Sequence, residues 1–258
     1  ASLVKNADAA MYQAKAHGRN RIEFYTPDLS LHASERMTLE HDLHRAIERG
    51  ELQLHYQPKL RLGSRELVGA EALLRWRHPQ HGYVPPERFI AIAEENGSIV
   101  ELGDWVLQEA CRQMQQWQTG YRPFGPLAVN LAGAQLRKPQ LVGRISELLR
   151  GAALGPESLQ LEITETFVMN RKEEALPILQ ALKELGLQLA IDDFGTGYSS
   201  LSYLKRLPLD ILQIDQSHEF PYGIIAKAWE LGILNLSVPK EVKGFEIDAV
   251  SSALIIKE

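Results

Sequence analysis

Apolar strand-like runs alternate with helix-like stretches along most of this chain, and their spacing restricts the fold. Three consecutive strand-like runs are residues 127–131, 159–164 and 188–191. Asn130 and Glu162 lie within the first two runs and Asp192 directly follows the third, and these polar residues are 32 and 30 positions apart. Alternation of this kind favours parallel β/α units, and a barrel of eight units in about 250 residues repeats every ~31. We therefore predict an α/β fold, a TIM-like (β/α) barrel, for these 258 residues.

Further predicted elements extend the alternation to both sides of these runs. The predicted strands are residues 21–25, 52–56, 67–74 and 211–215. The predicted helices are residues 8–17, 34–49, 86–117, 140–150 and 173–185. Pro27 and Asp28 predict a break before the second helix, because both residue types are common in turns.

Composition excludes several classes of protein. The chain is 45% hydrophobic and 24% charged with a net charge of -5, which is ordinary for a globular protein. No basic field is present to recruit a nucleic acid polymer or an anionic membrane, and no apolar run is long enough to span a bilayer. Cys111 is the only cysteine, which excludes an internal disulfide and suits a reducing cytoplasm. The first residue is Ala rather than Met, so we expect a fragment of a longer protein.

Two adjacent carboxylates, Asp192 and Asp193, follow an apolar run and precede a loop with glycines at positions 195 and 197. Like charges held this close are costly, and a divalent cation removes that cost. The alternative is that an aspartate caps a helix that follows the strand, which would explain one of the two residues.

Other polar residues occupy otherwise apolar strands. Glu71, Asn130 and Glu162 each lie within such a run, and in a barrel the chemistry sits where the strands end. Either glutamate alone could instead be a buried acid in a salt bridge. Together with the two aspartates, these oxygen ligands favour hard cations such as Mg²⁺ or Mn²⁺. Four carboxylates can balance two such ions, which predicts a paired-metal site for phosphoryl chemistry.

Other motifs have simpler explanations. Asp-Phe-Gly at 193–195 also occurs in kinase metal sites, but no kinase glycine loop or His-Arg-Asp loop accompanies it. His78 and His81 are spaced like metal ligands, yet a proline-flanked turn favours a surface location. Glu165 is either a supporting acid or a charge at a helix start. Core packing at helical spacing is expected for Leu107, Cys111 and Met114.

Several motifs occur here in one order. They are Glu-Ala-Leu-Leu-Arg-Trp at 71–76, Val-Asn-Leu at 129–131, Leu-Glu-Ile-Thr-Glu at 161–165 and Asp-Asp-Phe-Gly-Thr-Gly-Tyr-Ser-Ser-Leu at 192–201. Together they resemble the EAL family of cyclic-di-GMP phosphodiesterases over roughly residues 39–217. Because separate motifs agree in order and spacing, the resemblance is specific.

The resemblance implies roles for individual residues and a two-metal site for Mg²⁺ or Mn²⁺. The implied metal ligands are Glu71, Asn130, Glu162 and Asp192 for one cation, with Asp192 and Asp193 for a second. Catalytic roles fall to Glu71, Glu162 and Asp193, around a water that opens cyclic-di-GMP to linear pGpG. Gln57 and Arg75 are expected to contact the substrate, and the planar fork of arginine suits a phosphate.

The start of the chain resembles a different domain. Residues 1–25 are similar to the closing helix and strand of a GGDEF (diguanylate cyclase) domain, so we expect this chain to be part of a larger GGDEF-EAL protein. Residues 26–38 would then be a linker helix region, 39–217 the EAL domain and 218–258 a divergent tail. We further expect a cytoplasmic homodimer with no membrane contact from this fragment.

Two departures from the family pattern bear on activity. The family has a lysine two residues before the aspartate of the sixth strand, and this chain has Gln213 there. Only 43 residues follow Asp215, whereas two full units need about 62. Residues 253–256 could form a compressed eighth strand, and Glu241 could replace an acid of the family, so closure of the barrel is left open.

Three functions are compatible with this sequence. The first is a metal-dependent cyclic-di-GMP phosphodiesterase, which the intact metal ligands favour. The second is a degenerate EAL domain that binds the dinucleotide without efficient hydrolysis, which Gln213 and the altered tail favour. The third is a dimerisation module that uses the loop after Asp193.

Overall fold

The chain forms two compact units, which are Ala1–Gln53 with Arg75–Ser98, and Leu54–Leu74 with Ile99–Glu258. The computed structural model describes residues 3–4, 6–7, 10–11, 20, 22, 24–61, 64–120, 125–194, 203, 206–214 and 255–256. For residues 27–34, 172, 193, 212–214 and 255–256 it describes the backbone alone.

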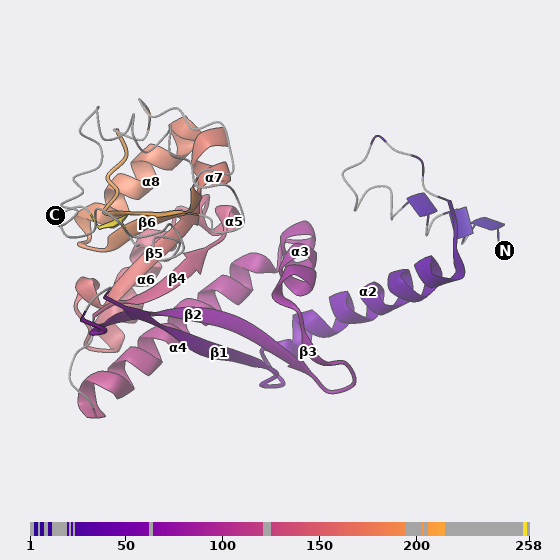
Figure 1. Ribbon diagram of the computed structural model, residues 1–258, viewed down its shortest axis with the longest axis horizontal. Helices are drawn as coiled ribbons and strands as arrows, with labels where there is room; N and C mark the ends of the chain where they lie inside the picture. The colour runs from indigo at the N-terminus through magenta and orange to yellow at the C-terminus, as the bar shows by residue number, and fades with distance from the viewer. Residues whose placement is uncertain are drawn as a thin grey trace. The chain divides into compact units, whose positions relative to one another are not determined.

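The strands belong to one mainly parallel sheet (Figure 1). They are β1 (Leu52–Leu60), β2 (Leu67–His78), β3 (Gly82–Val84), β4 (Leu127–Leu131), β5 (Leu159–Thr164), β6 (Gln188–Phe194), β7 (Ile211–Ile214) and β8 (Ile255–Ile256). Their order is β1-β2-β4-β5-β6-β7-β8, with β3 paired to β2. The pairs from β2 through β4, β5 and β6 to β7 are parallel, whereas β8 is antiparallel to β7.

Helices lie between β3 and β4, between β4 and β5 and between β5 and β6, as strand–helix alternation predicts, and one helix precedes β1. They are α2 (Pro27–Ala46), α3 (Pro86–Asn96), α4 (Ile99–Gly120), α5 (Gly133–Leu136), α6 (Leu141–Gly151), the short 3₁₀ helix η1 (Pro156–Ser158), α7 (Glu165–Asn170) and α8 (Lys172–Glu184). The long helix predicted at 86–117 is two helices. Gly97 ends α3 with a φ of 84°, a conformation that favours glycine and stops a helix.

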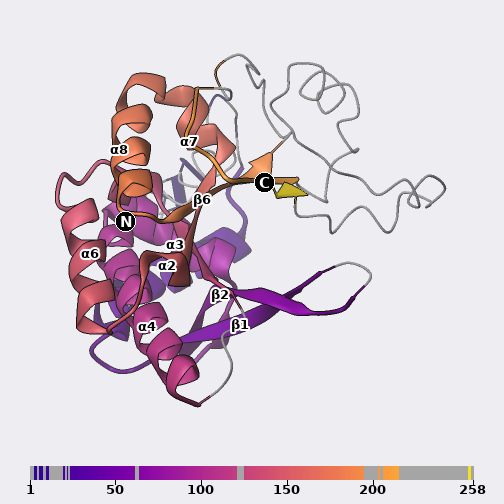
Figure 2. The ribbon, with the colours of Figure 1, turned by 90° about the vertical axis from the view of Figure 1, so that its left-hand side faces the viewer.

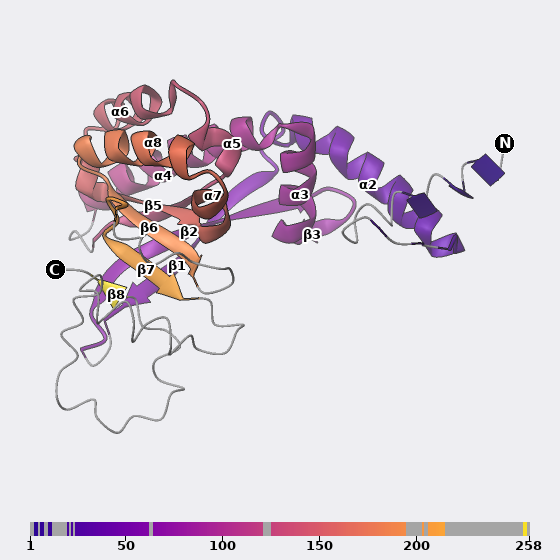
Figure 3. The same cartoon turned by 90° about the horizontal axis from the view of Figure 1, so that it is seen from above.

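In the second unit, one face of the sheet packs under helices α4, α6 and α8 (Figures 2 and 3). Side chains alternate between the two faces of a strand, so every second residue of β4, β5 and β6 points to these helices. The sheet residues of this core include Leu127, Val129, Leu159, Leu161, Leu189 and Ile191. The polar residues at the intervening positions therefore belong to the opposite face.

The predicted core positions on α4 are confirmed. Leu107, Cys111 and Met114 are all buried. Burial also raises the pKa of the Cys111 thiol to about 11, so this thiol stays protonated and unreactive near neutral pH.

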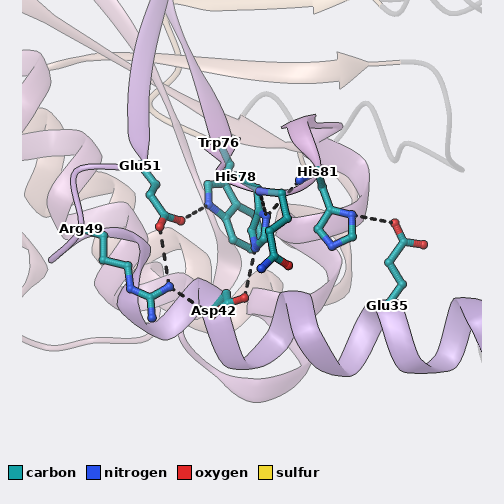
Figure 4. A network of polar contacts seen from close by, with 8 residues as sticks. Glu35, Asp42, Arg49, Glu51, Trp76, His78 and His81 are labelled. Carbon is teal, nitrogen blue, oxygen red and sulfur yellow. Dashed lines mark hydrogen bonds and ion pairs between the residues drawn. The ribbon is translucent and has the colours of Figure 1, made fainter.

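The first unit contains a polar network between α2 and β2 (Figure 4). His78 is buried at 3% exposure, and its Nε2 is 3.1 Å from Asp42 Oδ2. Its Nδ1 accepts hydrogen bonds from the backbone N–H groups of Gln80 and His81 at 3.1 and 3.2 Å. The ring proton therefore resides on Nε2 and is donated to Asp42.

Three further residues extend this network (Figure 4). The fully buried Trp76 donates Nε1–H to Glu51 Oε2 at 3.0 Å. Arg49 Nη1 lies 3.1 Å from Asp42 Oδ1 and 3.7 Å from Glu51 Oε1. Each buried polar group named here thus has a partner, which is the usual condition for burying it.

Three sequence predictions are wrong or need revision. The surface location predicted for His78 is wrong, because β2 continues to this residue and Asp42 of α2 supplies a partner; His81 is exposed. The break at Pro27 is wrong, because proline is tolerated in the first turn of a helix and Pro27 begins α2. Among residues 22, 24 and 25, the described part of the predicted strand at 21–25, the structure has no strand.

The last strand bears on the predicted barrel. Ile255–Ile256 does form a strand within the predicted segment 253–256, but it pairs with β7 in antiparallel orientation. A closed (β/α)₈ barrel is built from parallel strands, so β8 is not the eighth strand of such a barrel. Glu241 and most of residues 1–25 and 218–258 lie outside the described residues, and the domain boundaries stay predictions. Within the described residues, no helix is both long and apolar enough to cross a membrane.

Candidate functional site

Four of the predicted site residues share the sheet face that is opposite to the helices of the second unit. In the strand register, Asn130 of β4 lies beside Glu162 of β5, and Asp192 of β6 lies beside Thr164 of β5. Glu71 of β2 is paired with Ala128 of β4, which is two residues before Asn130 and on the same face. The parallel register therefore gathers these polar groups from four neighbouring strands.

Hydrogen bonds link these residues in pairs. Asn130 Nδ2–H donates to Glu71 Oε1 at 3.0 Å. Glu162 Oε1 accepts from Gln160 Nε2 at 2.8 Å and from Lys59 Nζ at 2.5 Å. The side chain of Glu162 is fully buried, with 0% exposure, so its charge is held inside the protein by these donors.

Sequence reasoning missed Lys59 as a member of this cluster. A signal was present, because Lys59 is two residues after Gln57 on β1, and residues two apart on a strand face the same side. Tyr56, at the alternate parity, packs edge-on against Trp117 of α4 with ring centroids 4.8 Å apart. Lys59 therefore belongs to the face that is opposite to this helix.

The acids of the cluster influence one another electrostatically. Burial raises the pKa of Glu71 above its usual range, and the charges of Glu162 and Asp192 raise it further. Lys59 and the hydrogen bond from Asn130 act in the opposite direction. A raised carboxyl pKa at a group of acids indicates unfavourable charge that a cation would relieve.

The adjacent aspartates lie at an irregularity in β6. Ile191 pairs with Leu212 of β7 and Phe194 pairs with Ile214, so β6 contains one residue more than its partner between these pairs. A bulge of this kind interrupts the strict alternation of faces. In a regular strand, the adjacent residues Asp192 and Asp193 would face opposite sides of the sheet. The bulge allows both to face the same site. The side chain of Asp193 lies outside the described part of the structure.

The remaining predicted residues are placed as follows. Gln57 is exposed on β1, and Arg75 is partly buried on β2 within the first unit. Gln213 lies on β7, and its side chain is among those not described. Glu165 is buried as the first residue of α7.

The donor set suits a hard divalent cation in chemical type. It consists of carboxylate and amide oxygens, which Mg²⁺ and Mn²⁺ prefer. Among the described residues, however, no three His, Cys, Asp or Glu side chains are grouped closely enough to hold a metal ion. The structure thus brings together Glu71 with Asn130 and Glu162 with Lys59, and the complete ligand set stays a prediction.

A buried glutamine supports the backbone that follows Asn130. Gln135 Oε1 accepts from the backbone N–H of Ala132 at 3.1 Å, at the start of α5. The Gln135 side chain lies against Gly103 of α4, where an added Cβ would come within 2.2 Å of its amide. The absence of a side chain at Gly103 therefore makes room for the group that holds this loop.

Comparison with known proteins decides the family. The family model for the EAL domain matches residues 40–219. The chain belongs to the EAL domain family. The EAL match covers strands β1 to β7 and the carboxylates described above. A second model, for the N-terminal domain of acyl-CoA dehydrogenases, matches residues 203–258.

Relatives of this EAL domain include two proteins of Pseudomonas aeruginosa. The bifunctional diguanylate cyclase/cyclic di-GMP phosphodiesterase MucR is 48% identical over 214 residues, which are 83% of this chain and 31% of MucR. The cyclic di-GMP phosphodiesterase NbdA is 44% identical over 215 residues, which are 83% of this chain and 28% of NbdA. This chain therefore spans less than a third of either relative.

A solved structure also resembles this EAL domain. The PaMucR phosphodiesterase in complex with c-di-GMP superimposes with a TM-score of 0.70 at 44% identity, covering 76% of this chain and 82% of that chain. Because EAL domains of this kind form TIM-like barrels, the fold class predicted from the sequence is confirmed. The sheet described for this chain is not closed.

Proposed function

We propose that this chain is a metal-dependent phosphodiesterase domain that hydrolyses cyclic-di-GMP to linear pGpG in bacterial second-messenger signalling. The observation that carries the proposal is the convergence of Glu71, Asn130, Glu162 and Asp192 on one face of the sheet. Similarity to MucR and NbdA, and to a relative bound to c-di-GMP, supports this substrate.

The proposed cofactor is Mg²⁺ or Mn²⁺ in a two-metal site. Glu71, Asn130, Glu162 and Asp192 would hold one cation, and Asp192 with Asp193 would hold the second. Such ions activate a water and stabilise the charge that develops on phosphorus during in-line displacement. The bulge in β6 supports a shared role for the two aspartates, because strict alternation would separate them.

The protein's own residues would orient the reacting groups. The amide of Asn130, hydrogen-bonded to Glu71, fixes that carboxylate. Gln57 and Arg75 are proposed to bind the dinucleotide, with two parallel N–H donors of the guanidinium on a phosphate. Glu71, Glu162 and Asp193 are the proposed catalytic residues.

An alternative function is supported by Gln213 on β7. A neutral amide cannot provide the fixed positive charge that the family's lysine offers to the phosphate or the attacking water. Removal of one preorganised charge-stabilising group costs about 10²–10³ in rate. The chain would then bind cyclic-di-GMP and hydrolyse it slowly, acting as an effector or as a dimerisation module.

Incubation with cyclic-di-GMP and Mg²⁺ or Mn²⁺, followed by chromatography for pGpG, tests the proposal. We expect binding that depends on metal, and slow turnover that Gln213→Lys raises with little change in affinity. Fast hydrolysis by the unaltered chain would refute the role given to Gln213. An inactive Gln213→Lys variant that still binds would assign the defect to the altered tail, and loss of binding would leave only the dimerisation module.

Three further expectations are part of the same proposal. They are a cytoplasmic location, a homodimer, and attachment to a GGDEF domain within a longer protein. The names of the relatives support the last of these, since MucR combines diguanylate cyclase and phosphodiesterase activities. The loop after Asp193, proposed for dimerisation, lies outside the described residues.

A further inference from the structure

A lysine side chain enters the carboxylate cluster of the second unit from β1. Lys59 Nζ lies 2.5 Å from Glu162 Oε1, across 103 positions of sequence. Lys59 keeps 18% of its side-chain exposure and Glu162 keeps none. An ion pair so shielded from water interacts strongly, because its charges are poorly screened.

Lys59 is paired with the acid on β5, the strand between those that carry Asn130 and Asp192. Glu162 lies beside Asn130 in the strand register, and Asn130 donates a hydrogen bond to Glu71. The cation of Lys59 thus acts on the same group of oxygens that the proposed metal site needs.

We propose that Lys59 is an internal counter-ion of this site and competes with divalent cations for its carboxylates. In the absence of metal, the ammonium group balances Glu162 and positions it. Binding of a divalent cation at Glu162 then has to weaken this ion pair, so Lys59 lowers the metal affinity of the site. This inference rests on the metal site of the proposed function and makes Lys59 a positioning residue.

Removal of the Lys59 charge should change two measurable quantities in opposite directions, the stability of the metal-free protein and its affinity for a cation. Removal of the Lys59 charge leaves the acids uncompensated, which destabilises the metal-free protein. The same removal makes the site more negative, which strengthens its attraction for a cation. A residue with only a structural role would change stability without raising metal affinity.

The experiment measures Mn²⁺ affinity, from the electron paramagnetic resonance signal of free Mn²⁺, and the melting temperature in a chelator. Lys59→Met removes charge and hydrogen bond together. Lys59→Gln removes the charge but keeps a hydrogen-bond donor on a slightly shorter side chain, so it stays informative if Lys59→Met fails to fold. Lys59→Arg keeps the charge.

The matched control is Lys183→Met. Lys183 Nζ also lies 2.5 Å from a carboxylate, Asp210 Oδ1, and this acid binds the backbone N–H of Leu189 near the start of β6. The control therefore removes an equally short lysine–carboxylate pair in the same unit, away from the cluster.

We expect Lys59→Met and Lys59→Gln to melt at lower temperature than the wild type in chelator and to bind Mn²⁺ about tenfold more tightly. Lys59→Arg should keep an affinity near that of the wild type. Lys183→Met should lower the melting temperature and leave Mn²⁺ affinity unchanged.

The outcomes separate this inference from the proposed function. If the wild type binds Mn²⁺ and neither neutral variant binds it more tightly, the role of Lys59 is refuted while the phosphodiesterase proposal stands. If only the neutral variants bind Mn²⁺, the inference is supported and metal-dependent hydrolysis by the unaltered chain is refuted. If no variant binds Mn²⁺, the inference is refuted, and the pGpG assay alone judges the proposed function.

Discussion

The two units bury polar groups in different ways. Around His78 and Trp76 in the first unit, donors and acceptors match, and the charge of Asp42 faces Arg49 and the proton of His78. On the sheet face opposite the helices of the second unit, acids lie near other acids, so burial and like charges raise the pKa of Glu71. A matched network stabilises a fold, whereas an unbalanced group of acids is the kind of arrangement that proteins keep for binding or catalysis.

The largest expected effect comes from removing the centre of the matched network. Trp76 is fully buried, packs edge-on against Phe89 with ring centroids 5.7 Å apart, and is bonded to Glu51. Trp76→Ala should lower the free energy of unfolding by about 3–5 kcal/mol, measured by urea denaturation. The control Tyr83→Ala alters a side chain that is 57% exposed and should cost less than about 0.5 kcal/mol. Equal losses in both variants would contradict the importance given to this network.

A smaller loss of unfolding free energy is expected when His78 is replaced. His78→Leu keeps the volume roughly constant but removes the partner of Asp42 and the acceptor for two backbone N–H groups. Leaving such groups unsatisfied should cost about 1–3 kcal/mol. A double-mutant cycle with Asp42→Leu measures how much of this belongs to the pair. Additive losses would show that the two residues are not coupled.

In the second unit, replacing an acid should stabilise the protein. The folded-state pKa of Glu71 is raised, so the folded protein binds this proton more tightly than the unfolded chain does. Stability is therefore lost as pH rises from the ordinary glutamate value of 4.5 through the folded pKa. Metal-free Glu71→Gln should melt at higher temperature than the wild type above this range, with the difference vanishing at lower pH. If Glu71→Gln is less stable than the wild type at all pH values, the claim that the charge of Glu71 destabilises the folded protein is refuted.

The smallest expected effect on stability is that of Asp42, and its dependence on pH is opposite to that of Glu71. The hydrogen bond from His78 and the charge of Arg49 lower the pKa of Asp42 below 3.8. This carboxylate therefore contributes stability above its ordinary pKa, and the contribution is lost as pH falls through the folded value. Asp42→Asn should melt below the wild type at neutral pH, and the two curves should converge in acid. Parallel curves from neutral pH to pH 3 would contradict this assignment.

The part of the fold that follows from local pattern could be predicted from sequence. The strands at 127–131 and 159–164 match β4 and β5 because buried parallel strands are short apolar runs. The common face of Asn130, Glu162 and Asp192 also followed, since equal spacing in parallel units brings strand positions into register.

Features that depend on partners distant in sequence could not be predicted. The burial of His78 depends on Asp42 of α2, 36 positions away, and Lys59 finds its acid 103 positions away. The helical and strand periodicities of the sequence report local structure only, so they do not reveal such distant pairs. The start of α2 at Pro27 was missed for a different reason, because proline marks both turns and first helical turns.

Gly103 has a practical consequence for protein engineering. Replacing a glycine inside a helix with alanine is a standard way to raise thermostability, and helix propensity favours it by about 1 kcal/mol. Here the added methyl group would displace Gln135, which holds the backbone N–H of Ala132 just after Asn130. A stabilisation strategy based on helix propensity alone would therefore select Gly103→Ala, which disturbs the loop that follows Asn130. The helix and the site cannot be optimised independently at this position.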